Sequence, residues 1–310
     1  MKLAFVFPGQ GSQAVGMMKG FDAHPAVRAT FDEASSVLGE DLWALVTQGP
    51  EDALDLTVNT QPVMLTAGVA VWRAWQAAGG PVPAMVAGHS LGEYSALVAA
   101  GALAFRDAVP LVRFRAQAMQ EAVPPGEGAM AAILGADDDT VAAACRAAAE
   151  GHAVEPVNFN APSQVVIAGE RAAVERAMLA AKELGARRAV LLPVSAPFHS
   201  RLMRPAADRL AERLVRVPLN TPGIPVVHNV DVAVHPGPDA IRAALAQQAA
   251  RPVRWTQTIQ TFAAAGVTHV VECGPGKVLA NLVKRIDDSL EALALTSGSM
   301  LDDALAQLKG

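Results

Sequence analysis

The order of apolar and polar positions predicts alternating strands and helices over the first part of the chain. Residues 3–7 form an apolar run typical of a buried strand, and residues 84–87 form a second one. Apolar residues at helical spacing predict helices over residues 23–38, 62–78 and 106–122. This alternation favours an α/β layer built on a largely parallel sheet.

A Pro- and Gly-rich break at residues 124–128 interrupts the alternation. After it we expect a strand, a helix, two strands, a helix and a strand, over residues 129–134, 137–150, 155–159, 164–168, 171–184 and 189–194. Asn160-Ala161-Pro162-Ser163 between the two middle strands is typical of a hairpin. This βαββαβ order is that of the ferredoxin-like unit, so residues 127–196 are predicted to form a small inserted domain.

The α/β pattern then resumes, so residues 1–126 and 197–310 are predicted to form one discontinuous large domain. Its second part is expected to contain strands over residues 224–228, 267–272 and 290–295. Its helices are expected over residues 202–217, 239–250 and 256–265, then up to residue 286, and over 301–308.

Composition and charge exclude several classes of protein. The chain of 310 residues is 52% hydrophobic and 18% charged, which is typical of a folded enzyme. Its net charge of -5 and the lack of a basic run argue against a nucleic-acid-binding protein. No stretch reaches the ~18–20 uncharged apolar residues of a membrane span, and the start is too short for a signal peptide. Cys145 and Cys273 lie far apart, which indicates reduced thiols and a cytoplasmic location.

The opening loop, Gly9-Gln-Gly-Ser-Gln-Ala14, has the GxGxxA form of a dinucleotide-binding turn after a strand. Such a site needs an acidic residue about 20 positions on, at the end of a second strand. Asp32 and Glu33 instead lie inside a predicted helix. The pattern therefore argues against a nucleotide site and leaves a glycine-rich turn whose role the loop itself does not define.

Gly88-His89-Ser90-Leu91-Gly92 has the GxSxG form between a predicted strand and an alanine-rich helix that runs to residue 100. A sharp strand-to-helix turn exposes the serine oxygen at the helix N-terminus. The two glycines remove the Cβ clashes that such a turn would create. The amide of Leu91 can then donate to a developing oxyanion. The motif predicts that Ser90 is a nucleophile, the alternative being a tight turn with an idle serine.

A serine nucleophile needs a base, and the chain has seven histidines. His89 adjoins Ser90 and should point away from it. His199 follows a predicted strand where the small domain returns to the large one, and such crossings carry function. No acidic residue between Ser90 and His199 ends a large-domain strand. We therefore expect a Ser–His dyad that is oriented by something other than a carboxylate.

Five motifs in order carry a resemblance that spans nearly the whole chain: FPGQGSQ, GHSLGEY, VRFRAQAM, SAPFHS and ECGPGKVLANL. Together they resemble the malonyl-CoA:acyl-carrier-protein transacylases of type II fatty acid synthesis. The resemblance implies an α/β-hydrolase-like large domain with a parallel-rich sheet and an inserted ferredoxin-like small domain. It also implies ping-pong transfer of a malonyl group through a malonyl-serine.

The resemblance assigns roles to the reacting groups. Ser90 corresponds to the nucleophile, and His199 to the general base that later acts as acid. The amides of Gln10 and Leu91 correspond to the oxyanion hole. Gln248 corresponds to a residue whose backbone carbonyl orients the histidine, although the adjacent Gln247 leaves that alignment open.

The resemblance also assigns the substrate pocket. Arg115 corresponds to the arginine that binds the free malonyl carboxylate, and Met119 to a pocket wall. These two residues are four apart on one predicted helix, so they share a face, whereas Arg113 should point elsewhere. Phe198, beside the predicted base, would crowd a 2-methyl group and favour malonyl over methylmalonyl.

The implied partners are malonyl-CoA and an acidic holo-acyl-carrier protein, with no nucleic acid, no membrane, no metal and no cofactor, and a monomer is expected. Basic residues that could meet the carrier flank the insert and the His199 loop: Lys182, Arg187, Arg188, Arg201 and Arg204. Alternatives stay open: a stand-alone acyltransferase of a polyketide synthase or malonate decarboxylase, a serine thioesterase or esterase, or a silent carrier-binding module. A thioesterase would have a triad acid and no use for Arg115.

Overall fold

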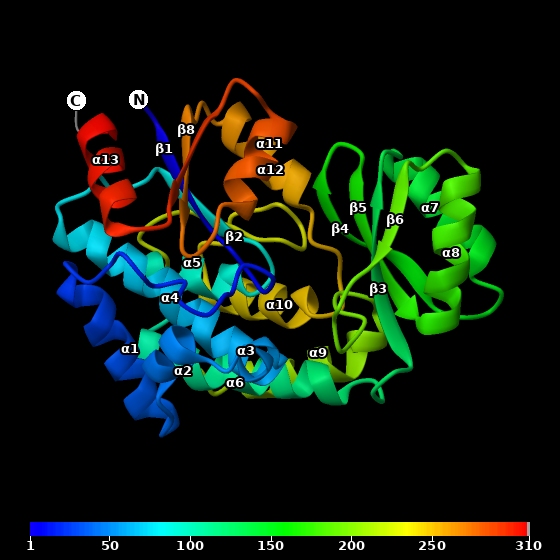
Figure 1. Cartoon of the computed structure of the whole chain (residues 1–310), viewed down its shortest axis with the longest axis horizontal. Helices are drawn as coiled ribbons and strands as arrows, with labels where there is room; N and C mark the ends of the chain where they lie inside the picture. The colour runs from blue at the N-terminus through cyan, green and yellow to red at the C-terminus, as the bar shows by residue number, and fades with distance from the viewer. Residues whose placement is uncertain (309–310) are drawn as a thin grey trace.

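A five-stranded parallel sheet lies at the centre of the larger part of the chain, in the computed structural model, which describes residues 1–308 (Figure 1). Its strands lie in the order β7 (Val226–Val227), β2 (Met85–Gly88), β1 (Leu3–Phe7), β8 (His269–Cys273) and β9 (Glu291–Leu295). Phe7 pairs with Gly88, so the C-terminal ends of β1 and β2 lie side by side. The loops that follow these two strands therefore meet at one edge of the sheet.

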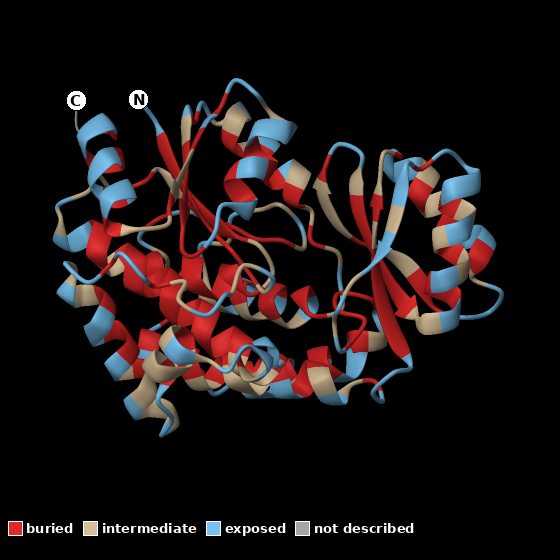
Figure 2. Cartoon of the chain, viewed as in Figure 1, coloured by how far each residue is buried: buried red, intermediate tan, exposed pale blue. Residues whose placement is uncertain are grey.

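Helices cover both faces of this sheet, which explains why all five residues of β1 are buried. Phe5 and Phe7 belong to the core on one face, and the Phe5 ring lies 5.3 and 5.2 Å from those of Trp72 and Trp75. Ala4 and Val6 belong to the core on the other face. Figure 2 shows this buried centre in red.

The two faces are covered by different helices. The Phe5 side packs against α1 (Pro25–Leu38), α4 (Thr57–Ala77), α5 (Gly92–Ala99), α6 (Phe105–Glu121), α9 (Arg204–Leu214), α10 (Pro238–Gln248) and α13 (Gly298–Leu308). The Ala4 side packs against α11 (Trp255–Ala264) and α12 (Val278–Ile286).

The smaller unit is a four-stranded antiparallel sheet in the order β4 (Val154–Ala161), β5 (Gln164–Glu170), β3 (Gly128–Leu134) and β6 (Arg188–Leu191). Helices α7 (Asp138–Ala148) and α8 (Arg171–Glu183) pack on its outer face (Figure 1). Along β3, Ala131 and Ile133 face these helices, whereas Met130 joins the core of the larger unit. The predicted βαββαβ order and the predicted fold class are confirmed.

Some predicted elements were wrong in extent. Helices α2 (Leu42–Gln48) and α3 (Glu51–Asp55) were not predicted, because they are too short to show a period. Helix α4 begins before its predicted start and keeps Pro62 inside it. The predicted helix over residues 202–217 is divided into a 3₁₀ turn, η1 (Arg201–Met203), and α9, which has a proline in its first turn.

The predicted strand over residues 224–228 is reduced to β7, because the N–H of His228 turns back to the carbonyl of Ala233. The strand predicted over residues 189–194 ends at Leu191. The domain boundaries at residues 127 and 196 stay a prediction, and residues 309–310 of the predicted large domain lie outside the described residues.

Two further expectations concern the state of the cysteines and the presence of membrane-spanning helices. Cys145 and Cys273 are both free and buried. Within residues 1–308, no helix is long and apolar enough to cross a membrane.

Candidate active site

Ser90 lies on the turn between β2 and α5, with φ at +52°, in the left-handed region that non-glycine residues rarely occupy. Both flanking glycines are required by close backbone contacts. A Cβ on Gly88 would lie 1.8 Å from the carbonyl carbon of Gly92, and a Cβ on Gly92 would lie 2.0 Å from the carbonyl oxygen of Phe7. The glycine requirement predicted from GxSxG is therefore confirmed, and the turn holds the serine in a strained conformation.

The side chain of Ser90 meets that of His199 across 109 positions of sequence. Ser90 Oγ lies 2.7 Å from His199 Nε2. His199 Nδ1 donates to the backbone carbonyl of Gln248 at 2.8 Å. Since Nδ1 carries the proton in this arrangement, Nε2 is free to accept one from the serine. A backbone carbonyl occupies the place that a carboxylate has in a Ser–His–Asp triad, and the neighbouring Gln247 is exposed.

His199 is 3% exposed, and its environment disfavours the imidazolium. Burial, and after it the positive charge of Arg115, together lower the pKa of His199 to about 3. The imidazole is therefore neutral at neutral pH, which is the form that a general base requires.

Arg115 is the charged group of the site, and its side chain is almost completely buried. One terminal nitrogen donates to Gln61 Oε1 at 2.8 Å. The other donates to Gln248 Oε1 at 2.9 Å and to Ser90 Oγ at 3.1 Å. Its Nε has no acceptor among the described residues. A buried guanidinium whose hydrogen bonds all go to neutral groups, next to a serine, is suited to binding an anionic ligand.

The opening loop packs directly against the turn that carries Ser90. A Cβ on Gly9 would lie 2.6 Å from the carbonyl oxygen of His89 and 3.7 Å from the amide nitrogen of Leu91. Gln10 Nε2 donates to Thr57 Oγ1 at 3.3 Å, which holds the loop on α4. Within residues 1–308, neither the amide of Gln10 nor that of Leu91 donates to another residue. Both amides thus remain available beside the serine.

A cavity of about 130 Å³ lies between the two units and contains the dyad. Seven of the eight predicted site residues line it: Gln10, Ser90, Leu91, Arg115, Met119, Phe198 and His199. Gln248 supports His199 and Arg115 from outside this lining. The smaller unit adds Met130 and Asn158 to the wall. The small volume of the cavity suits a short acyl group.

Sequence reasoning missed five polar residues of this site, one of which is Asn158 in the cavity wall. Gln61 contacts Arg115, and Asn160 Oδ1 lies 2.8 Å from His89 Nε2. Glu93 and Asn229 lie behind the turn and are fully buried. Glu93 had a signal in the sequence, because it is a charged residue of the motif GHSLGEY in the first turn of an otherwise apolar helix. The side-chain amides of Gln61, Asn160 and Asn229 had no such signal, since each comes from a separate segment of the chain.

His89, which was expected to point away from Ser90, lines the cavity and contacts Asn160, whereas three charged residues considered from the sequence lie outside it. Arg113 forms an ion pair with Glu40 at 2.5 Å on the outside of α6. Asp32 and Glu33 lie on α1, as predicted, and pair with arginines. Within residues 1–308, no group of three or more His, Cys, Asp or Glu residues is placed to hold a metal ion.

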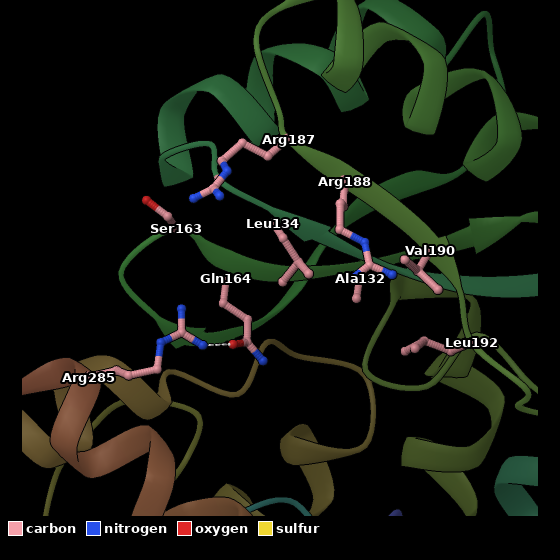
Figure 3. Close-up of a pocket in the computed structure, with 10 residues that line it drawn as sticks. Ala132, Leu134, Ser163, Gln164, Arg187, Arg188, Val190, Leu192 and Arg285 are labelled. Atoms are coloured by element: carbon pink, nitrogen blue, oxygen red, sulfur yellow. Dashed lines mark hydrogen bonds between the residues drawn. The ribbon is translucent and has the colours of Figure 1, made fainter.

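The basic residues that flank the insert do not share one groove. Arg187 and Arg188 line a groove of about 700 Å³ between β6 and α12, where Arg285 faces them (Figure 3). Arg201 and Arg204 border two other grooves. The groove of Figure 3 contains neither Ser90 nor His199.

Comparison with known proteins places this geometry in a family. The family model described as "Acyl transferase domain" matches residues 4–300. The malonyl CoA-acyl carrier protein transacylase of Escherichia coli (strain K12) is 58% identical over 305 residues, which cover 98% of this chain and 99% of that protein. The protein of the same name from Bacillus subtilis (strain 168) is 46% identical over 310 residues, or 99% and 98% of the two chains.

Solved structures agree with these relatives. The acyl-carrier-protein S-malonyltransferase of Burkholderia pseudomallei 1710b superposes with a TM-score of 0.97 at 62% identity, covering 99% of this chain and 100% of that chain. A malonyl-transacylase solved in complex with a holo type II PKS acyl-carrier protein superposes with a TM-score of 0.98 at 52% identity, covering 99% and 100%.

Proposed function

The chain belongs to the acyl transferase family, and from this premise we propose that it transfers malonyl groups from malonyl-CoA to the phosphopantetheine thiol of holo-acyl-carrier protein, for fatty acid biosynthesis. The observation that carries the proposal is the buried guanidinium of Arg115, which donates to the oxygen of Ser90 at 3.1 Å. An acyl group on this serine that ends in a carboxylate would place that carboxylate within reach of the arginine. The enzyme is therefore a malonyl acyltransferase.

In the first half-reaction, Ser90 Oγ attacks the thioester carbon of malonyl-CoA while His199 Nε2 takes the serine proton. The amides of Gln10 and Leu91 donate to the oxyanion of the tetrahedral intermediate, and losing one such donor typically costs about 3–4 kcal/mol in the barrier. The C–S bond then breaks, and His199 returns the proton to the sulfur of the departing coenzyme A. The product is a malonyl ester on Ser90.

In the second half-reaction, the phosphopantetheine thiol gives its proton to His199 and attacks the ester carbon. The C–O bond to Ser90 breaks, and His199 returns the proton to the serine oxygen. Malonyl-carrier protein leaves, and the enzyme is restored. No step of this scheme uses a metal or a cofactor bound to this chain, since the phosphopantetheine belongs to the carrier protein.

Selectivity for malonyl follows from Arg115 and Phe198. Two parallel N–H donors of a guanidinium match the two oxygens of a carboxylate. Acetyl-CoA would leave this buried group without its partner, and a site built on a polar partner rejects analogues lacking it by about 10⁴-fold. Phe198 lines the cavity and would crowd a 2-methyl group, but exclusion of one methyl is worth only about 1–3 kcal/mol.

An acidic carrier protein needs a local basic surface on this negatively charged chain. The groove with Arg187, Arg188 and Arg285 offers one on the side where the two units meet (Figure 3). Electrostatic attraction at such a surface would raise the association rate and make it sensitive to salt. We include this groove in the proposal as the first contact of the carrier.

The test is the intact mass of the purified chain after mixing with malonyl-CoA, for wild type, Ser90→Ala and His199→Ala. We expect one malonyl adduct on wild type, none on Ser90→Ala, and loading on His199→Ala that is slower by orders of magnitude. An adduct that persists on Ser90→Ala would overturn the assignment of the nucleophile.

One observation favours a polyketide carrier protein as a second acceptor. It is the similarity to a malonyl-transacylase solved with a type II PKS acyl-carrier protein. Transfer from the malonyl enzyme to carrier proteins of both kinds, compared by kcat/KM, distinguishes the pathways. Fatty-acid carriers are expected to be the faster acceptors.

A further inference from the structure

Asn229 holds the backbone of the nucleophile from both sides of the turn. Its Oδ1 accepts from the amide of Ser90 at 2.7 Å, and its Nδ2 donates to the carbonyl of Gly88 at 2.7 Å. The side chain is fully buried and does not line the cavity. It therefore reaches the serine only through the main chain of the turn.

The sheet explains how Asn229 comes to this place. β7 runs parallel to β2, and Val227 pairs with Ala87. The residue two positions beyond Val227 therefore lies beside the first residues of the turn after β2. A two-residue strand that ends here delivers one amide side chain to the left-handed turn at Ser90.

Glu93 fixes Asn229 in turn. Its Oε2 accepts from the backbone amide of Asn229 at 2.9 Å, and its Oε1 accepts from His228 Nδ1 at 2.8 Å. Both oxygens of a fully buried carboxylate are thus occupied by the segment that carries Asn229. Main chain and side chain of Asn229 are held at once, so it is a rigid support for the strained turn.

The same carboxylate reaches the other half of the dyad. Gln248 Nε2 donates to Glu93 Oε2 at 3.0 Å and to the carbonyl of Ser90 at 2.8 Å. The backbone carbonyl of Gln248 accepts from His199 Nδ1. A single residue, Asn229, therefore connects Glu93 to Ser90. A single residue, Gln248, connects Glu93 to His199.

We propose that Asn229, anchored by Glu93, is a positioning residue that keeps Ser90 Oγ in line with His199 Nε2 during acyl transfer. The proposal rests on the proposed function, because its measure is the rate at which Ser90 is acylated. Asn229 touches neither substrate nor reacting atoms. Displacing a reacting atom by about 1 Å can cost about 10²-fold in rate, so the loss of this support should appear in the acylation rate constant.

The experiment follows malonylation of the full-length chain by intact mass in single-turnover time courses. Asn229→Ala removes both contacts, and Asn229→Asp keeps the shape while turning the donor to Gly88 into an acceptor. Asn59→Ala is the matched control, since Asn59 donates to the backbone carbonyl of Ala53 and does not line the cavity. Each variant is measured with malonyl-CoA and with acetyl-CoA.

We expect the acylation rate constant to fall about 10- to 100-fold in both Asn229 variants. The final fraction of acylated protein, the malonyl-CoA concentration for half-maximal rate, and the malonyl-to-acetyl preference should stay those of wild type, because Arg115 is not contacted. Asn59→Ala should keep the wild-type rate constant. A merely structural role of Asn229 would instead lower the acylated fraction at an unchanged rate constant.

Wild-type rate constants in the Asn229 variants would overturn the proposal and leave the proposed function intact. A reduced acylated fraction at the wild-type rate constant would also overturn it. If Asn229→Ala does not fold, the acylation rate constant of Asn229→Asp alone tests the proposal, because this variant keeps the side-chain volume and the contact to the Ser90 amide. If wild type itself is not malonylated, the proposed function fails first.

Discussion

Replacement of Arg115 by alanine is expected to remove the preference for malonyl-CoA and leave the Ser–His chemistry in place. The guanidinium contributes two kinds of interaction that the structure separates. Its contacts to Gln61, Gln248 and Ser90 Oγ hold it in place, and its buried charge is available to a carboxylate. Only the second depends on which acyl group is present.

The magnitude follows from those contacts. A carboxylate that accepts two parallel charge-assisted hydrogen bonds gains about 1.5–3 kcal/mol from each, or about 3–6 kcal/mol together. That range corresponds to a loss of about 10²- to 10⁴-fold in kcat/KM for malonyl-CoA. Acetyl-CoA has no free carboxylate and makes no such contact with Arg115, so its kcat/KM should change little. The ratio of the two values should therefore fall by nearly the whole factor.

The assay measures kcat/KM for both thioesters by initial rates of Ser90 loading, for wild type, Arg115→Ala and Arg115→Lys. Arg115→Lys keeps the charge but has no parallel donors, so an intermediate ratio is expected. Arg113→Ala is the matched control on the same helix, because Arg113 pairs with Glu40 away from the cavity. Equal losses for malonyl and acetyl in Arg115→Ala would refute the reasoning, since they would mean that Arg115 serves only the fold or the dyad.

Four further outcomes follow from the site. Because burial and Arg115 lower the pKa of His199 to about 3, kcat/KM for malonyl-CoA should stay level as the pH falls from 7 past 6.5, and an acidic limb centred near 6.5 would contradict this. The contribution of His199 to the free energy of unfolding should be present above pH 6.5 and lost as the pH falls toward 3, because only the unfolded chain then protonates this histidine. The difference between wild type and His199→Ala in urea titrations measures this contribution. Gly88→Ala should destabilise the fold by about 3 kcal/mol or more in the same titrations, as a Cβ would lie 1.8 Å from the main chain of Gly92, and near-native stability would show that the turn can relax. Phe198→Ala should raise methylmalonyl loading relative to malonyl by about 10-fold, measured by competition, and an unchanged ratio would exclude Phe198 as the steric filter.

Much of the fold was predictable because the pattern of apolar residues and the turn residues between the elements indicate the same boundaries. The strand at Leu3–Phe7 begins and ends where its apolar run does, and the hairpin between β4 and β5 lies at Asn160-Ala161-Pro162-Ser163. Element ends were less predictable where tertiary contacts decide. β7 stops after two residues because His228 turns toward Ala233 and its side chain enters the buried contact with Glu93.

The site was predictable where a motif has a local physical cause. GxSxG identifies the turn at Ser90 because its glycines relieve backbone clashes that any such turn would have. The position of Gln248 was predictable only through resemblance, since nothing in its surroundings marks a backbone carbonyl as the partner of a histidine. Asn229 and Glu93 were missed, because their roles arise from the pairing of β7 with β2 and not from spacing along the chain.

The central claim is that Ser90 carries the malonyl group between two thiols. Its most direct test is to malonylate the enzyme, remove free malonyl-CoA, map the adduct by peptide mass spectrometry, and add holo-acyl-carrier protein to the isolated acyl-enzyme. The account predicts that the adduct lies on Ser90 and passes to the carrier protein as the serine is freed. An adduct on another residue, or one on Ser90 that yields free malonate and no malonyl-carrier protein, would contradict it.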